Sequence, residues 1–355
     1  MKSPIRIQGK LHPFSHLPGA VCLVPKTSIE VQIFPCLIRL RDLNKSAAVH
    51  EYSLNAGELK QFTVELDLEG GLVRVWGEAA QGYLRYRIYA KERALFLELE
   101  RGPAGLQFGS TTLKKGAPTK LRDLSQPVFS TSQEKLSLGK HRLQDWDQIK
   151  ARADLAELLP ACYALSQQSF SIDRNVKRAG VLKLLDQLRE QISQKNKLEV
   201  DSILSQIFQV GFQGILSPRI YDENFLGILP FEPLDKELSS TLMLTELGQL
   251  VRSLFFQASE KEVSFLPCLP PGFHSGRFIR VKWEGDEIDF EWSKKQLKQV
   301  VWRCNSKKQI KLHLPKPLGS FRARGSLRAR GERKSALNLL DLPQATIYLD
   351  RFEKG

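Results

Sequence analysis

The chain has 355 residues, of which 42% are hydrophobic and 26% are charged. This balance is typical of globular proteins and excludes an intrinsically disordered chain. It holds no apolar run of about 18 residues, so we expect no transmembrane segment, and residues 1–6 lack the apolar core of a secretory signal. The five cysteines are scattered without metal-site spacing. We therefore predict reduced core thiols in a cytoplasmic protein.

The net charge of +14 is concentrated near the C-terminus. Residues 294–334 contain fourteen Lys and Arg but only one acid, Glu332. Any anionic partner would therefore be expected to bind this stretch.

The first 110 residues have the alternation of β-strands. Apolar and polar residues alternate in segments separated by glycines, at the spacing of an all-β sandwich. The expected strands are 29–33, 37–40, 61–68, 72–76, 83–90 and 94–100.

Residues 103–140 lose this alternation and are rich in Gly, Pro, Ser, Thr and Lys. Such composition indicates a linker or a long surface excursion, which we bound at 111–144.

Residues 145–258 have helical periodicity. Asp145 or Asp147 is a suitable N-cap for a first helix over 145–166, in which Pro160 would cause a kink or a restart. Further helices are predicted over 175–194, 198–210 and 239–257, the last capped by Ser239 or Ser240. A long loop over 211–238 separates the last two.

Residues 259–355 return to strands. A short strand over 263–266 is followed by prolines and Gly272, which indicate a rigid turn. A three-stranded antiparallel meander then covers 277–283, 287–292 and 296–303, and later strands are expected at 309–314 and 345–350.

The predicted fold class is therefore multidomain α+β. It comprises an N-terminal β-sandwich (1–110), a linker (111–144), a truncated all-α helical domain (145–258) and a basic, antiparallel C-terminal β-sandwich (259–355).

Four short motifs near the end of this series occur in a recognisable order. A helix over 246–257 precedes the strand and turn at 265–270, a glycine turn at 275–277 and an Asp-Phe-Glu-Trp ending at 289–292. This order resembles the α-L-fucosidase/α-L-galactosidase family of glycoside hydrolases, family 95. The resemblance implies an N-terminal β-sandwich, a helical linker, an (α/α)6 barrel and a small C-terminal β domain.

The helical part is short for that family. A complete barrel has twelve helices and needs roughly 200 residues or more, so the resemblance implies a truncated, partial barrel. The family's catalytic base is an aspartate in a motif like F-Q-I-D-G-N-F-G. At the matching place, 231–238, the aspartate is Asp235, while the glycines and the asparagine are absent.

The long loop offers further carboxylates for sugar chemistry. Glycoside hydrolysis uses two carboxyl groups about 5–10 Å apart, and Asp222 and Glu223 join Asp235 as the candidate catalytic set. Arg219 and Tyr221 beside them are candidate substrate-binding residues. The alternative interpretation is an acidic surface loop in which Arg219 is an ion-pair partner.

Trp146 and Asp145 are a second candidate set, because an aromatic ring with neighbouring carboxylates is a common sugar-stacking arrangement. The alternative is a helix N-terminus whose buried tryptophan anchors the linker. The histidines have no metal-site spacing, and there is no glycine-rich nucleotide motif, so no metal or cofactor is predicted.

The basic stretch carries a direct repeat, 321–325 and 327–331. Arg322, Arg324, Arg328 and Arg330 would form a row of guanidinium groups suited to phosphates if the chain is extended. The alternative is a basic loop that promotes solubility or faces an acidic partner.

Two functional hypotheses follow. In the first, the protein is a degenerate glycosidase relative with a non-catalytic carbohydrate-binding or scaffold role, or with weak glycoside hydrolase activity. In the second, it is a cytoplasmic binding protein whose 294–334 region contacts nucleic acid, anionic lipid or an acidic protein.

Overall fold

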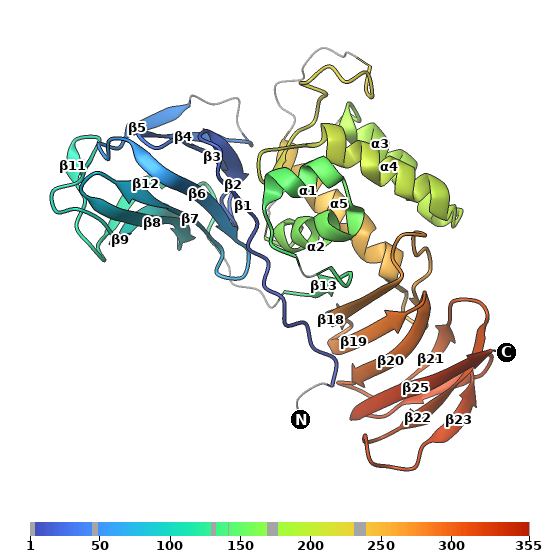
Figure 1. The fold of residues 1–355 in the computed structure, drawn as a ribbon. Coiled ribbons are helices and arrows are strands. Elements are labelled where there is room, and N and C mark those ends of the chain that lie inside the picture. The colour runs from blue at the N-terminus through green and yellow to red at the C-terminus, as the bar shows by residue number, and fades with distance from the viewer. Residues whose placement is uncertain are drawn as a thin grey trace.

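The computed structural model describes residues 4–44, 49–128, 133–140, 142–168, 177–230 and 239–354. Strands account for 43% of the chain and helices for 19%. The fold is therefore a mixed α+β arrangement dominated by sheets, as the sequence predicted (Figure 1). No helix in the described ranges has the length and apolar character needed to cross a membrane.

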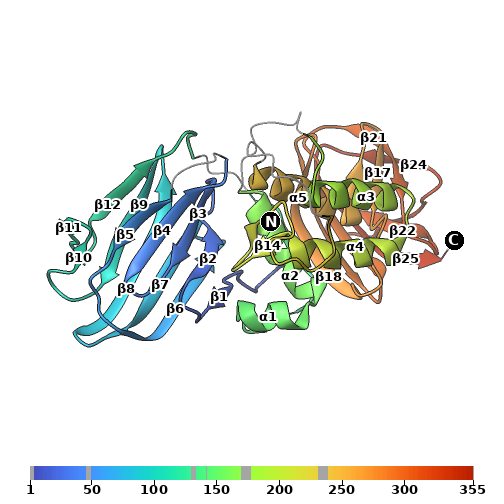
Figure 2. The same cartoon turned by 90° about the horizontal axis from the view of Figure 1, so that it is seen from above.

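Two sheets from the N-terminal part lie face to face (Figure 2). Their apolar residues form the core between them, including Val31 and Ile38 from one sheet and Val64 and Ile88 from the other. The six-stranded sheet has the order β1 (Phe14–Ser15), β6 (Leu59–Asp67), β7 (Leu72–Ala79), β8 (Gly82–Lys91), β9 (Ala94–Arg101) and β12 (Pro118–Asp123). The four-stranded sheet has the order β2 (Ala20–Leu23), β3 (Ile29–Ile33), β4 (Leu37–Asp42) and β5 (His50–Ser53).

The strands predicted from alternation in this part are confirmed, with β3 at the expected bounds Ile29–Ile33. The segment expected as a linker, 111–144, contributes strands to three sheets. Its strand β12 pairs with β9, and β13 (Lys135–Ser137) pairs with β18 near the other end of the chain. A small hairpin of β10 (Gln107–Phe108) and β11 (Thr111–Thr112) lies just before β12.

Five helices occur in the described ranges: α1 (Trp146–Arg152), α2 (Leu155–Ser166), α3 (Val181–Ser193), α4 (Lys197–Val210) and α5 (Ser240–Phe255). The N-caps expected at Asp145 and Ser239 are confirmed. Helices α2 and α5 pack closely, because a Cβ added to Gly248 would lie 2.0 Å from the Ser166 hydroxyl.

Two helix bounds differ from the prediction. Of the kink or restart expected at Pro160, the restart is wrong: the chain breaks at Ala153, which has a left-handed φ of 51°, and Asp154 caps α2. Pro160 lies inside α2. Helix α3 starts at Val181, later than predicted, after Gly180 with its φ of 53°; residues 175 and 176 of the prediction lie outside the described residues.

Two further sheets form the C-terminal part. The meander is confirmed as β18 (Ser275–Trp283), β19 (Asp286–Ser293) and β20 (Gln296–Arg303). They join β13, β25 (Thr346–Lys354), β22 (Leu318–Arg324) and β23 (Glu332–Ser335) in a seven-stranded sheet. The other sheet has β16 (Phe256–Ala258), β17 (Glu262–Phe265), β21 (Lys308–His313) and β24 (Leu339–Leu342). Its β17–β21 pair is parallel, so this part is not purely antiparallel as predicted.

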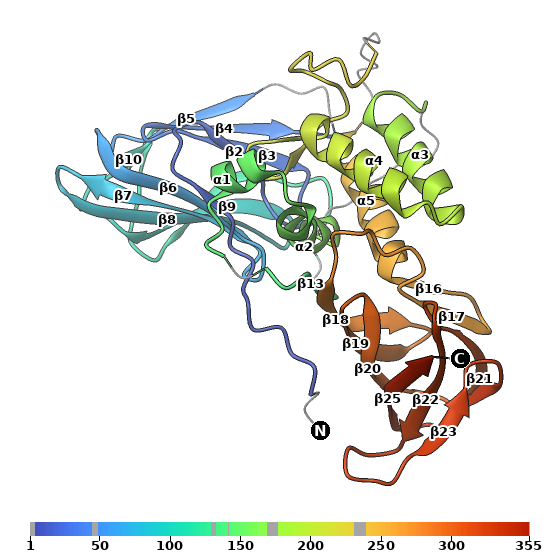
Figure 3. The ribbon, with the colours of Figure 1, turned by 45° about the vertical axis from the view of Figure 1, so that its right-hand side comes forward.

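A nearly buried carboxylate joins the helices to the C-terminal sheet. Glu134 accepts hydrogen bonds from the Tyr163 hydroxyl of α2, from Arg252 of α5 and from the backbone N–H of Lys282 in β18. The N-terminal segment makes a second connection, running from the first sheets towards β18–β20 (Figure 3). There Ile5 packs with Val301 and Tyr348.

Candidate functional site

A pocket of about 410 Å³ opens where α1 meets the end of α4 and the loop that follows it. This volume lies within the range of roughly 300–1,000 Å³ that is usual for small-molecule sites. The pocket is lined by residues from three places: α1 and the start of α2, the last two turns of α4, and the loop over 212–226.

Aromatic rings form part of the wall. Phe208 of α4 and Phe212 just beyond it are stacked, with ring centroids 5.2 Å apart and an interplanar angle of 21°. Trp146, at the first position of α1, also lines the pocket and is only 2% exposed. Such flat apolar faces pack well against the C–H faces of a sugar ring, while hydroxyl groups point to neighbouring polar side chains.

The polar part of the wall is mostly uncharged. Ser205, Gln209 and Asn224 line the pocket, and Gln209 and Asn224 are exposed. An amide side chain offers one acceptor and two donors, which suits hydroxyl groups that can both give and accept. Lys150 and Arg219 are the charged residues of the lining.

A chain of polar contacts fixes the loop and Arg219. Buried Glu30 of β3 accepts hydrogen bonds from Gln213 Nε2 at 2.7 Å and from the Ser217 hydroxyl. Gln213 Oε1 in turn accepts from Arg219, whose Nε lies 3.5 Å from Glu223. Contacts with the N-terminal sheet therefore fix the position of Arg219.

The backbone of the loop docks directly on strand β2. The Ile215 N–H donates to the Val21 carbonyl at 2.7 Å. Gly214 approaches so closely that an added Cβ would lie 2.1 Å from the same carbonyl oxygen, and its φ is +49°. Only glycine fits this position without strain.

The second predicted set, Asp145 and Trp146, has a structural role. Asp145 Oδ1 accepts from the backbone N–H groups of Asp147 and Gln148, at 3.1 and 3.2 Å, and thereby caps α1. Trp146 is buried behind this cap. The interpretation as a helix N-terminus with an anchoring tryptophan is confirmed, although Trp146 also lines the pocket.

The loop residues lie partly at the pocket. Arg219 lines it, and Glu223 pairs with Arg219 from an exposed position. Tyr221 packs partly buried against the core. Asp222 has both carboxylate oxygens shielded from solvent and without a hydrogen bond. The third catalytic candidate, Asp235, lies outside the described residues.

No Asp or Glu occurs among the described residues that line this pocket. Glycoside hydrolysis needs two carboxyl groups on either side of the scissile bond. The described wall offers aromatic rings and hydrogen-bonding groups, but it presents no acid–base pair. The catalytic roles of Asp222, Glu223 and Asp235 remain predictions.

The C-terminal basic stretch differs from the expected open row. Arg322 binds Asp350 of β25 through two hydrogen bonds, at 2.8 and 3.0 Å, and Arg324 binds the same carboxylate. These guanidinium groups and neighbouring Arg351 hold the pKa of Asp350 below its usual range, outweighing the opposing effect of burial. Two of the four arginines of the repeat, Arg322 and Arg324, are therefore already paired with a carboxylate of the protein.

Other cations of this stretch are also compensated. Arg303 pairs with Glu287 and Asp289, Lys308 with Asp286, and Arg333 with Glu353. These acids lie outside 294–334 in sequence and reach it because the fold brings β19 and β25 close to β20, β21 and β23.

Arg328 and Arg330 make no ion pair or hydrogen bond with the residues that the structure describes. Arg330 lines an open groove of about 650 Å³ together with Lys307, Arg324 and Lys334, and the acids Glu332 and Asp341 lie in the same groove. Within the basic stretch, this groove is where an anion could meet Arg330.

Among the residues that the structure describes, His12 lies near Glu65 and Asp67 of β6 in a group that could hold a metal ion. Arg74 donates to Glu65 at 2.8 Å and lies 3.7 Å from Asp67. A guanidinium in this position already balances the carboxylates and would repel a cation.

All five cysteines are free thiols. Four are buried, as predicted for core thiols, while Cys36 is exposed.

Sequence reasoning missed most of the pocket. Phe208 and Phe212 were assigned to a helix and a loop, and Gln209 and Asn224 were not singled out. The available signal was the spacing of the two phenylalanines, four residues apart across a helix end. No protein-family model matches the chain, and no curated protein matches it.

Proposed function

We propose that this protein binds carbohydrate in the pocket beside Trp146 and does not hydrolyse it. The observation that carries the proposal is the composition of the wall: stacked Phe208 and Phe212, the amides Gln209 and Asn224, and no carboxylate among its described residues. Aromatic faces with a few convergent polar groups are what a neutral polyhydroxylated ligand requires.

The resemblance to family 95 glycosidases supports the same class of ligand. Its motif residues have packing roles here: Trp292 lies against Phe255 of α5 at 5.3 Å, and an added Cβ on Gly276 would lie 2.3 Å from the Trp292 ring. We infer a shortened relative that retains the exit of the barrel. The division into domains 1–110, 145–258 and 259–355 and the cytoplasmic location belong to the same proposal.

The test begins with a glycan array that includes fucosides and galactosides, followed by calorimetry on each glycan retained. We expect Gln209→Ala and Asn224→Ala each to weaken binding about three- to tenfold, because each loses one net hydrogen bond. Gln206→Ala is the matched control, since Gln206 lies on the same helix but does not line the pocket. Absence of binding to any glycan, or equal losses for all three variants, would refute the proposal.

Hydrolysis is measured in parallel with aryl-glycosides. We expect none above the buffer rate. If turnover occurs and disappears in Asp222→Asn, Glu223→Gln or Asp235→Asn, the protein is instead a weak glycoside hydrolase that uses those carboxylates.

A second candidate function is polyanion binding at the groove lined by Lys307 and Arg330, which is favoured by its 650 Å³ volume and by its uncompensated arginine. It would be measured by gel shift at two salt concentrations, because phosphate contacts make affinity fall steeply with salt. Binding that Arg328→Ala and Arg330→Ala leave unchanged would remove this candidate.

A further inference from the structure

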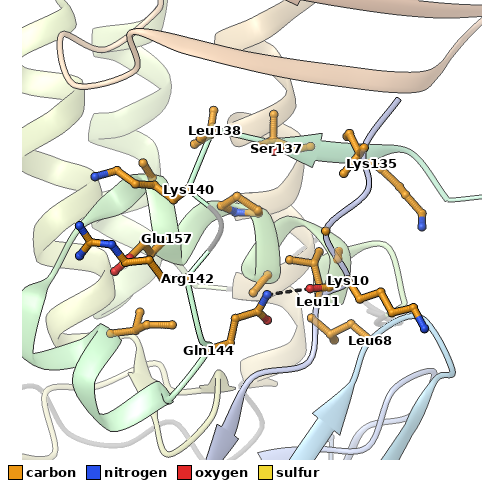
Figure 4. A pocket seen from close by; sticks show the side chains of 18 of the residues that line it. Lys10, Leu11, Leu68, Lys135, Ser137, Leu138, Lys140, Arg142, Gln144 and Glu157 are labelled. Atoms are coloured by element: carbon orange, nitrogen blue, oxygen red, sulfur yellow. Dashed lines mark hydrogen bonds between the residues drawn. The ribbon is translucent and has the colours of Figure 1, made fainter. Parts of the chain in front are cut away.

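A second pocket, of about 270 Å³, is also lined by Trp146. It is formed where the N-terminal segment around Leu11 passes between strand β13, helix α2 and the stretch before α1 (Figure 4). Trp146 is the one described residue that lines both pockets, and their other described lining residues differ.

The body of this second pocket is apolar. Leu136, Leu138, Ile149, Pro160 and Ala161 contribute to it, and all five are buried. A cavity of this size and lining fits one small aliphatic or aromatic group, and burial of that group would be the main source of affinity.

Glu157 provides a hydrogen-bond acceptor inside the pocket. Its side chain is only 5% exposed, and its Oε2 accepts from Arg152 Nε at 2.8 Å. Its Oε1 is shielded from solvent and has no hydrogen-bond partner. A buried carboxylate oxygen without a donor is costly, so a ligand that brings an N–H or O–H group to it gains that cost back.

The rim carries positive charge that is only partly compensated, and Arg142 also interacts electrostatically with Asp154. Lys135 pairs with Glu69 at 2.8 Å and Lys140 with Asp154 at 3.0 Å. Lys10 and Arg142 are exposed and make no ion pair within the part of the chain that the structure describes. An acidic group at the mouth would meet these two cations.

Figure 4 places these groups relative to one another. In that view Lys140, Arg142 and Glu157 lie on one side of the pocket, while Lys10, Leu68 and Lys135 lie on the other. Gln144 spans the gap by donating to the Lys10 carbonyl at 2.7 Å, which fixes the N-terminal segment as a wall.

We propose that this pocket binds a small apolar acid that also carries a hydrogen-bond donor, the chemistry of an apolar α-amino acid or α-hydroxy acid. The apolar group occupies the space against Pro160 and Ala161, the donor meets Glu157 Oε1, and the carboxylate meets Arg142. This site is separate from the proposed carbohydrate pocket and does not depend on it.

The experiment is calorimetry on the full chain with four ligands for each of two apolar side chains, those of leucine and phenylalanine: the amino acid, the matching α-hydroxy acid, the acid without a donor, and the amino acid amide without a carboxylate. We expect the amino acid, the hydroxy acid, or both to bind, and each partial analogue to bind about tenfold more weakly or worse. The first two ligands distinguish an ammonium from a hydroxyl donor.

Two variants locate the site. In Glu157→Gln the amide oxygen must face Arg152, which turns the amide N–H₂ towards the ligand's donor, so binding should fall about tenfold or more. Arg142→Ala removes an exposed side chain and should weaken the acids without affecting the amide. Arg328→Ala, an exposed arginine elsewhere, is the control and should bind like the unmodified protein.

Circular dichroism on each variant verifies that it is folded. If no member of either series binds, if the four ligands of a series bind equally, or if both Glu157→Gln and Arg142→Ala bind like the unmodified protein, the proposal is wrong. Glycan binding in the Gln209 and Asn224 experiments is unaffected by any of these outcomes.

Discussion

The 410 Å³ pocket lined by Phe208 and Phe212 and the C-terminal basic stretch differ in how their polar groups are used. In the pocket, few charges occur, but the amides Gln209 and Asn224 are exposed and face the open space. In the basic stretch, charges are dense, yet Arg322 and Arg324 share Asp350. The capacity to bind a ligand depends on polar groups that have no partner within the protein. It does not depend on the number of charges along the chain.

The largest effect is expected from a change in the loop that lines the pocket. Gly214→Ala places a Cβ against the Val21 carbonyl at a left-handed φ, so the loop must leave β2. We expect the free energy of unfolding to fall by about 2–3 kcal/mol and glycan affinity to be lost. Chemical denaturation and calorimetry measure the two effects.

Gly105→Ala is the control for that variant. Gly105 also has a positive φ, of +78°, but nothing lies within 4 Å of an added Cβ. It should cost about 1 kcal/mol and leave glycan binding intact. Similar losses in the two variants would mean that the contact with Val21 has no special role.

The next effect concerns anion binding by the C-terminal basic stretch. Asp350→Asn removes the anion that Arg322 and Arg324 share while keeping the size of the side chain. If the arginines are masked by Asp350, a generic polyanion such as heparin should bind about tenfold more tightly at low salt, with a steeper salt dependence. Titration at two salt concentrations measures this change. An unchanged affinity would show that Asp350 does not limit anion binding.

A smaller effect concerns acid pH. Because the pKa of Asp350 is lowered in the folded protein, its ion pairs stabilise the fold fully at neutral pH. That contribution shrinks as pH falls below the ordinary Asp value of about 4 and is lost below the lowered folded pKa. We expect Asp350→Asn to lower Tm by about 2–4 °C at pH 7 and by less at pH 3. A constant difference across pH would contradict the depressed pKa.

The smallest effect is expected at Arg333. Its pair with Glu353 is exposed, with side-chain exposures of 50% and 57%. Exposed pairs of long side chains gain little, so Arg333→Ala should leave Tm unchanged within experimental error. A fall as large as that of Asp350→Asn would mean that exposure does not separate the two pairs.

The sequence predicted those parts of the fold that depend on local patterns. Strand β3 and the meander β18–β20 alternate apolar and polar residues, and the caps Asp145 and Ser239 precede apolar helices, so each was readable in isolation. Strand β12 lacks such alternation, and its formation depends on pairing with β9. No local signal reports a partner strand.

The sites depended on contacts between distant segments and were therefore mostly missed. Asp350 meets Arg322 because β25 lies beside β22, an adjacency that local sequence patterns do not reveal across a separation of 28 positions. Glu30 reaches Gln213 across 183 residues. Trp146 and Arg219 were found because an aromatic residue and an arginine beside acids stand out locally, but Gln209 and Asn224 do not.

The central claim is that the pocket lined by Phe208 and Phe212 holds an intact carbohydrate. The most direct measurement is a crystal structure of the protein after prolonged incubation with a glycan that it binds in solution. The account predicts an uncleaved glycan in contact with Phe212, Gln209 and Asn224. A cleaved glycan in that pocket, or a glycan bound only at another surface, would contradict it.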